Sequence, residues 1–60
     1  MPFVTIEMYE GRTVEQKRKL VARVTEAISE TVNTSPEHVH IIIRDLPKHN
    51  SATGGKLASD

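Results

Sequence analysis

The stretch that decides the fold is residues 39–46, which read Val-His-Ile-Ile-Ile-Arg-Asp-Leu. β-Branched residues are favoured in strands, and three consecutive isoleucines leave no polar side for solvent. Such a run indicates a strand that is covered on both faces, as in a parallel sheet. A parallel strand needs a partner strand and a crossover connection, so the residues before it must supply both.

A helix is predicted over residues 14–32 as the crossover. Thr13 and Gln16 have the spacing of a capping box, and Asn33 is suited to a left-handed stop. Residues 35–36, Ser-Pro, predict the start of one short turn beyond it. Apolar residues at i, i+3, i+4 and i+7 form a stripe along the helix. The stripe comprises Leu20, Val21, Val24, Ala27, Ile28 and Val32.

Residues 2–9 predict the partner strand, because Val4, Ile6 and Met8 fall on one face at period two. A 14–32 helix would be about 28 Å long and the second strand about 26 Å, so the elements match in length. They predict one right-handed β-α-β unit. The polar residues after Pro47 predict a short hairpin or arm that lies on a neighbouring subunit. We therefore expect a single α/β (α+β) domain over residues 1–60.

The composition of the chain restricts the classes of function that it can have. Eight Lys plus Arg balance eight Asp plus Glu, so the net charge is zero, which argues against a nucleic-acid partner. No apolar run is long enough for a membrane span, and no targeting segment is evident, which favours the cytoplasm. The chain has no Cys, and its three His residues are not spaced like metal ligands, so we expect no structural metal site.

A 60-residue chain without Cys is also short of core. Chains of this size usually need disulfides, a metal or a partner chain, and only the partner remains. A lone two-stranded sheet would leave two open edges and one uncovered face. We therefore predict an obligate homo-oligomer that assembles beyond a dimer.

Pro2 is the one residue whose position suggests chemistry. Removal of Met1 would leave a free secondary amine at the start of a strand. An α-amino group has a reference pKa of about 7.7–8.0, and nearby cations or desolvation lower it toward the range of a general base. The simpler interpretation is that Pro2 only begins an edge strand, where proline is tolerated.

Five short motifs help to decide between these two interpretations of Pro2. Each motif alone is weak, but their order and spacing together are specific for one protein family. They are residues 1–3 (MPF), 10–17 (EGRTVEQK), 24–27 (VTEA), 39–43 (VHIII) and 54–55 (GG). On these motifs the chain resembles the 4-oxalocrotonate tautomerase family in its small-subunit form, over essentially the whole sequence.

The resemblance implies a β-α-β subunit assembled as a hexamer, a trimer of dimers, that works without metal or cofactor. It implies that Pro2 is the general acid/base and that Arg12 helps to hold a substrate carboxylate. The second role agrees with the bidentate fork that Arg offers to carboxylates.

Two positions depart from the family pattern. His40 stands where the best-known members have a second arginine, and Ser51 stands where they have an aromatic residue. His40, Ile42 and Arg44 share one face of the second strand, so His40 and Arg44 are further candidates for substrate binding. Alternatively, Arg44 is a solvated residue or is paired with Asp45.

Three functions follow from this pattern. The first is an isomerase, a keto–enol tautomerase acting on a small carboxylate substrate such as 2-hydroxymuconate. The second is water addition to, or dehalogenation of, an unsaturated acid, which needs a carboxylate to activate water. Residues 49–55 offer no acidic residue for that purpose. The third is a non-catalytic, oligomeric binding protein of the same fold.

Overall fold

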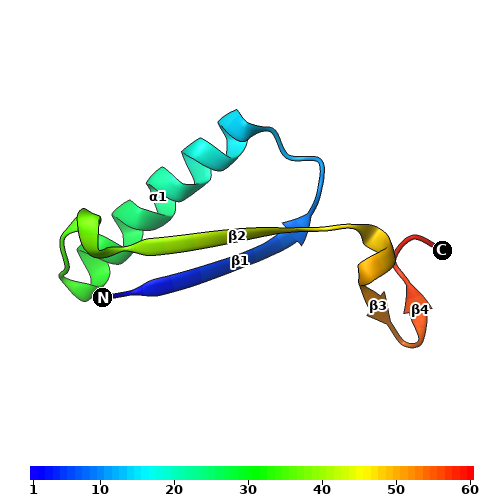
Figure 1. Ribbon diagram of the computed structural model, residues 1–60. Helices are drawn as coiled ribbons and strands as arrows, with labels where there is room; N and C mark the ends of the chain where they lie inside the picture. Colours follow the sequence, from blue (N-terminus) through cyan, green and yellow to red (C-terminus); the bar gives the residue numbers. More distant parts are fainter.

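The computed structural model describes residues 1–60 as a β-α-β unit followed by a small hairpin (Figure 1). Strand β1 (Phe3–Tyr9) leads into helix α1 (Val14–Val32), and a short 3₁₀ helix, η1 (Pro36–His38), precedes strand β2 (His40–Leu46). The two strands pair in parallel, from Phe3 opposite His40 to Tyr9 opposite Leu46. Each strand is one residue shorter than the sequence predicts, and the helix has the predicted limits.

Both ends of α1 follow from local chemistry. The Gln16 backbone N–H donates to Thr13 Oγ1 at 3.0 Å, and the Thr13 backbone N–H donates to Gln16 Oε1 at 2.9 Å. This reciprocal pair is the predicted capping box, and it satisfies two N–H groups at the helix start. At the other end Asn33 adopts the left-handed conformation, with φ 58° and ψ 57°. Asn adopts the left-handed region more readily than most other residues do, so the helix ends at Asn33.

The turn before β2 is held by a side-chain pair rather than by a helix cap. Ser35 precedes η1 but makes no capping bond, and its hydroxyl instead donates to the Glu37 carboxylate at 2.6 Å. This hydrogen bond lowers the pKa of Glu37 below its ordinary value, because it favours the charged form. The contact therefore favours the folded state at neutral pH, and its contribution is lost as pH falls through that lowered pKa.

Helix α1 covers one face of the two-stranded sheet (Figure 1). Side chains alternate along β1, with Val4, Ile6 and Met8 half-buried on the helix side and their neighbours exposed. Ile41 and Ile43 continue this layer on β2, whereas Ile42 points to the other face and is 55% exposed. The protomer thus leaves one face of β2 uncovered, as expected for a lone two-stranded sheet, and coverage of both faces stays a prediction for the assembly. Ala27 and Val32 of the predicted stripe are exposed as well.

The C-terminal segment extends away from this unit. A second 3₁₀ helix, η2 (Lys48–Asn50), leads to a hairpin of β3 (Ala52–Thr53) and β4 (Lys56–Leu57), which pair antiparallel as predicted. The hairpin projects beyond the end of the sheet (Figure 1). The protomer measures 43 × 24 × 13 Å and has a radius of gyration of 14.5 Å. A compact chain of this length would have a radius of gyration of about 10 Å.

No residue of the protomer is fully buried. The exposed apolar side chains include Phe3 (76%), Ile42 (55%) and Leu57 (42%), which lie on the uncovered sheet face and on the hairpin. A fold with no buried core cannot offset the conformational entropy that folding costs.

No helix is both long and apolar enough to span a membrane.

We therefore predict that the folded protein is an oligomer. Sedimentation at micromolar protomer concentration should show no major monomer, and the thermal midpoint should rise with protein concentration, because association stabilises the folded state by mass action. A folded monomer at that concentration, or a midpoint independent of concentration, would contradict this expectation.

Candidate functional site

Pro2 is held by the first hydrogen bond between the two strands. Its carbonyl accepts from the backbone N–H of His40 at 3.0 Å, and the Pro2 side chain is half-buried. Met1 precedes it with 69% of its surface exposed, so a peptidase can reach the bond between the two residues. The backbone around Pro2 is thereby fixed while the residue before it is free.

His40 lies next to Pro2 on the face that the helix leaves uncovered. Its ring stacks on the ring of Phe3, its register partner, with centroids 5.2 Å apart and planes 17° apart. Stacking fixes the orientation of the imidazole, which has no hydrogen-bond partner within the protomer. The structure thus brings two of the predicted site residues, Pro2 and His40, together at the N-terminal end of the two strands.

Arg12 lies at the opposite end of β1. The chain turns at Gly11, whose φ of 122° is reserved for residues without a Cβ, and then begins the helix. This turn places Arg12 at the rim of an open hollow of about 280 Å³. The hollow is lined by Met8, Arg12, Gln16, Lys17 and Leu20.

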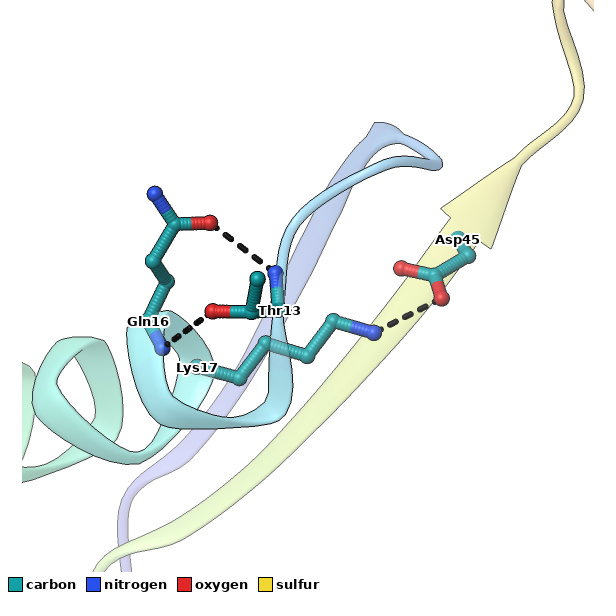
Figure 2. Close-up of polar contacts among 4 residues, drawn as sticks. All are labelled: Thr13, Gln16, Lys17 and Asp45. Atoms are coloured by element: carbon teal, nitrogen blue, oxygen red, sulfur yellow. Dashed lines mark hydrogen bonds and ion pairs between the residues drawn. The ribbon is translucent and has the colours of Figure 1, made fainter.

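The charges around this hollow are partly paired. Lys17 crosses from α1 to β2, where its Nζ lies 2.7 Å from Asp45 Oδ2 (Figure 2). Arg12 is exposed and makes no ion pair or hydrogen bond within the protomer. Arg12 is therefore the cation of the hollow that is free to receive an anion.

Arg44 belongs to the uncovered face and stands opposite Glu7 in the strand register. Successive strand residues point to opposite faces, so Asp45 lies on the helix side and meets Lys17 instead. Of the two alternatives for Arg44, pairing with Asp45 is therefore wrong, and within the protomer Arg44 is an exposed, solvated residue. Arg44 has no ion pair within the protomer and shares its face with His40 and Ile42, as predicted.

Ser51 makes a contact that the sequence does not indicate. Its hydroxyl lies 3.0 Å from the Tyr9 hydroxyl, which joins the segment before the hairpin to the end of β1. Ser51, which stands where the family pattern has an aromatic residue, thus contacts the aromatic residue Tyr9 of β1. Because 42 positions separate the two residues, no local pattern could have revealed the pair.

The protomer does not bring all the predicted site residues together. Pro2 precedes β1 and Arg12 follows it, so the whole strand, about 23 Å long, lies between them. One end of the sheet therefore offers Pro2 and His40, and the other offers Arg12 and the hollow. A site that contains both Pro2 and Arg12 requires two chains.

Comparison with known proteins agrees with this architecture. The family model described as "Tautomerase enzyme" matches residues 2–60. The 2-hydroxymuconate tautomerase of Bacillus subtilis strain 168 is 50% identical over 60 residues, which cover all of this chain and 97% of that protein. A probable tautomerase of Halalkalibacterium halodurans is 47% identical, with coverage of 100% and 98%.

Solved structures give the same result. The crystal structure of YwhB, a homologue of 4-oxalocrotonate tautomerase, has a TM-score of 0.94 and 49% sequence identity, covering 98% of this chain and 97% of that one. A structure from work on the 4-oxalocrotonate tautomerase isozymes of Methylibium petroleiphilum has a TM-score of 0.92 and 40% identity, with coverage of 97% and 91%. The chain therefore belongs to the tautomerase family and is an isomerase of the 4-oxalocrotonate tautomerase type.

Proposed function

We propose that this protein is a keto–enol tautomerase of 2-hydroxydienoates such as 2-hydroxymuconate, with Pro2 as its general acid/base. The observation that carries the proposal is the anchored position of Pro2, half-buried at the start of β1 and bonded through its carbonyl to His40. A relative with 50% identity is named 2-hydroxymuconate tautomerase, which supports this substrate class.

The chemistry begins when Met1 is removed. Pro2 then carries a secondary amine, which the strand holds in a fixed direction. The unprotonated amine takes the proton from the 2-hydroxyl group of the substrate and leaves a dienolate. The resulting ammonium returns a proton to a carbon of that dienolate, which yields the 2-keto product and regenerates the base. Cations around the site stabilise the negative charge that develops on the oxygen.

Arg12 supplies one of these cations from another chain. Because β1 separates Pro2 from Arg12 within a protomer, the substrate meets Pro2 of one subunit and Arg12 of its neighbour. The guanidinium binds the substrate carboxylate that is remote from the reacting hydroxyl. We propose that a hexamer, a trimer of dimers, provides this arrangement, and that the exposed apolar sheet face and the projecting hairpin form its contacts.

His40 and Arg44 complete the proposed site. His40 belongs to the same chain as Pro2 and presents a stacked, oriented imidazole beside it. Arg44 lies four residues after His40 on β2, so the backbone positions of the two residues are about 13 Å apart, and Arg44 makes no ion pair within the protomer. It is the second cation that we propose for the substrate, in place of the arginine that the family carries at position 40.

The first prediction concerns the amine of Pro2. In the processed enzyme, kcat/KM should rise with pH as the Pro2 amine loses its proton, because only the unprotonated amine can act as the base. Retention of Met1 converts the nitrogen to an amide and should abolish both the rise and most of the activity.

Intact mass and a spectrophotometric assay of 2-hydroxymuconate ketonisation test this prediction. Pro2→Ala is the matched control, because after processing it keeps a primary amine and should retain some activity with a changed pH profile. Equal turnover by protein shown to retain Met1 would exclude Pro2 as the base.

The second prediction concerns the remote carboxylate. Arg12→Ala removes a charged contact worth about 1.5–3 kcal/mol, so kcat/KM for a dicarboxylate should fall by roughly one to two decades. A monocarboxylate analogue should lose less, because it lacks the group that Arg12 binds. Arg18→Ala is a suitable control, since Arg18 pairs with Glu15 on the exposed side of α1 and lies outside the hollow. The same loss for both substrates would show that Arg12 has another role.

The third prediction tests the shared site by mixing subunits. Pro2→Ala and Arg12→Ala are co-refolded in equal amounts and assayed beside each homo-oligomer. If the two residues come from different chains, about one site in four of a randomly mixed oligomer combines an intact Pro2 with an intact Arg12. Activity should then exceed that of both parents. No gain, with mixing confirmed by native mass spectrometry, would place both residues of a site on one chain.

A further inference from the structure

The hollow beside Arg12 contains a second polar group whose bonding capacity is not used. Its polar lining consists of Arg12, Gln16 and Lys17, and its apolar lining is Met8 and Leu20. Lys17 is neutralised by Asp45 at 2.7 Å. The groups left for a ligand are therefore the Arg12 guanidinium and the Gln16 amide.

The capping box decides which end of the Gln16 amide remains free. The amide oxygen Oε1 accepts from the Thr13 backbone N–H at 2.9 Å, so it is committed to the helix start. Figure 2 shows the amide nitrogen on the side away from Thr13, and it has no partner within the protomer. An amide nitrogen can only donate. The free end of Gln16 is thus a pair of N–H donors, four residues after Arg12.

We propose that Gln16 is a substrate-binding residue that donates from its amide nitrogen to the carboxylate held by Arg12. The inference deepens the proposed function and rests on the role given there to Arg12. A carboxylate has two oxygens with several acceptor sites, so it can accept from the guanidinium and the amide together. The capping box then both starts α1 and orients this donor.

Asp45 sets the charge of the same subsite. By pairing with Lys17 it leaves the hollow with one uncompensated positive charge, that of Arg12. One cation with neutral donors beside it matches a carboxylate, which carries a single negative charge. Gln16 therefore strengthens binding without adding charge to the subsite.

The isosteric variant Gln16→Glu tests the proposal. Glutamate also serves in a capping box, so its carboxylate still accepts from the Thr13 N–H, and the helix start is kept. The donor, however, becomes an anion beside Arg12. Calorimetry with adipate, a six-carbon dicarboxylate, on the processed oligomer should show affinity at least about tenfold weaker than for the unmodified protein. Binding of hexanoate, which lacks the second carboxylate, should change by less than about twofold.

Lys19→Gln is the matched control. It changes the net charge by the same amount, and Lys19 is an exposed residue of α1 outside the hollow. Its adipate affinity should stay within about twofold of the unmodified protein. Gln16→Met, which loses the donor without gaining charge, provides a second test if Gln16→Glu fails to assemble, and it should weaken adipate binding relative to hexanoate binding. Circular dichroism and sedimentation verify that each variant is folded and assembled.

The outcomes separate this inference from the function on which it rests. Weaker adipate binding by Gln16→Glu, by the uncharged Gln16→Met and by Arg12→Ala, with Lys19→Gln unchanged, supports it. If Arg12→Ala weakens adipate binding but Gln16→Glu behaves like Lys19→Gln, the role of Gln16 is overturned and that of Arg12 stands. If Arg12→Ala has no effect on adipate, the carboxylate subsite itself is wrong and the inference fails with it.

Discussion

The parallel hydrogen bonding between β1 and β2 determines where each proposed site residue can act. Because both strands begin at the same end, the register places His40 beside the start of the chain and Leu46 beside Tyr9. Helix α1 must then return along the full length of the sheet, and its capped start lies with Arg12 at the far end. Pro2 and Arg12, for which we propose acid/base catalysis and carboxylate binding, are thus separated by one strand length, and only association of chains can bring them together.

The elements of the fold could be predicted because their signals are local. The capping box at Thr13 and the left-handed Asn33 each act within a few residues, so both limits of α1 are readable in the sequence. The run of isoleucines does not itself show which of them, such as Ile42, the single protomer leaves exposed. A pattern of apolar residues predicts burial, but it does not distinguish a side chain that is buried within one chain from one that is exposed on the protomer and available for contact with another chain.

The candidate site was only partly predictable for a related reason. Pro2 and Arg12 are marked by their positions at a chain start and at a strand–helix turn. The Lys17–Asp45 pair joins residues 28 positions apart and depends on how the helix lies across the sheet. The alternative that paired Arg44 with Asp45 is wrong because adjacent residues of a strand face opposite sides. Sequence proximity therefore misleads about charge pairing wherever the chain is extended.

The hydrogen bond at Pro2 has a consequence for how the protein matures. It uses the carbonyl of Pro2, and while Met1 is attached the proline nitrogen is a tertiary amide that has no hydrogen to donate to the sheet. Cleavage of Met1 therefore leaves the hydrogen bond between His40 and the Pro2 carbonyl in place. With the role that we propose for Pro2, the specific activity of a preparation would therefore report the fraction of chains that have lost Met1, which the strand pairing itself does not reveal.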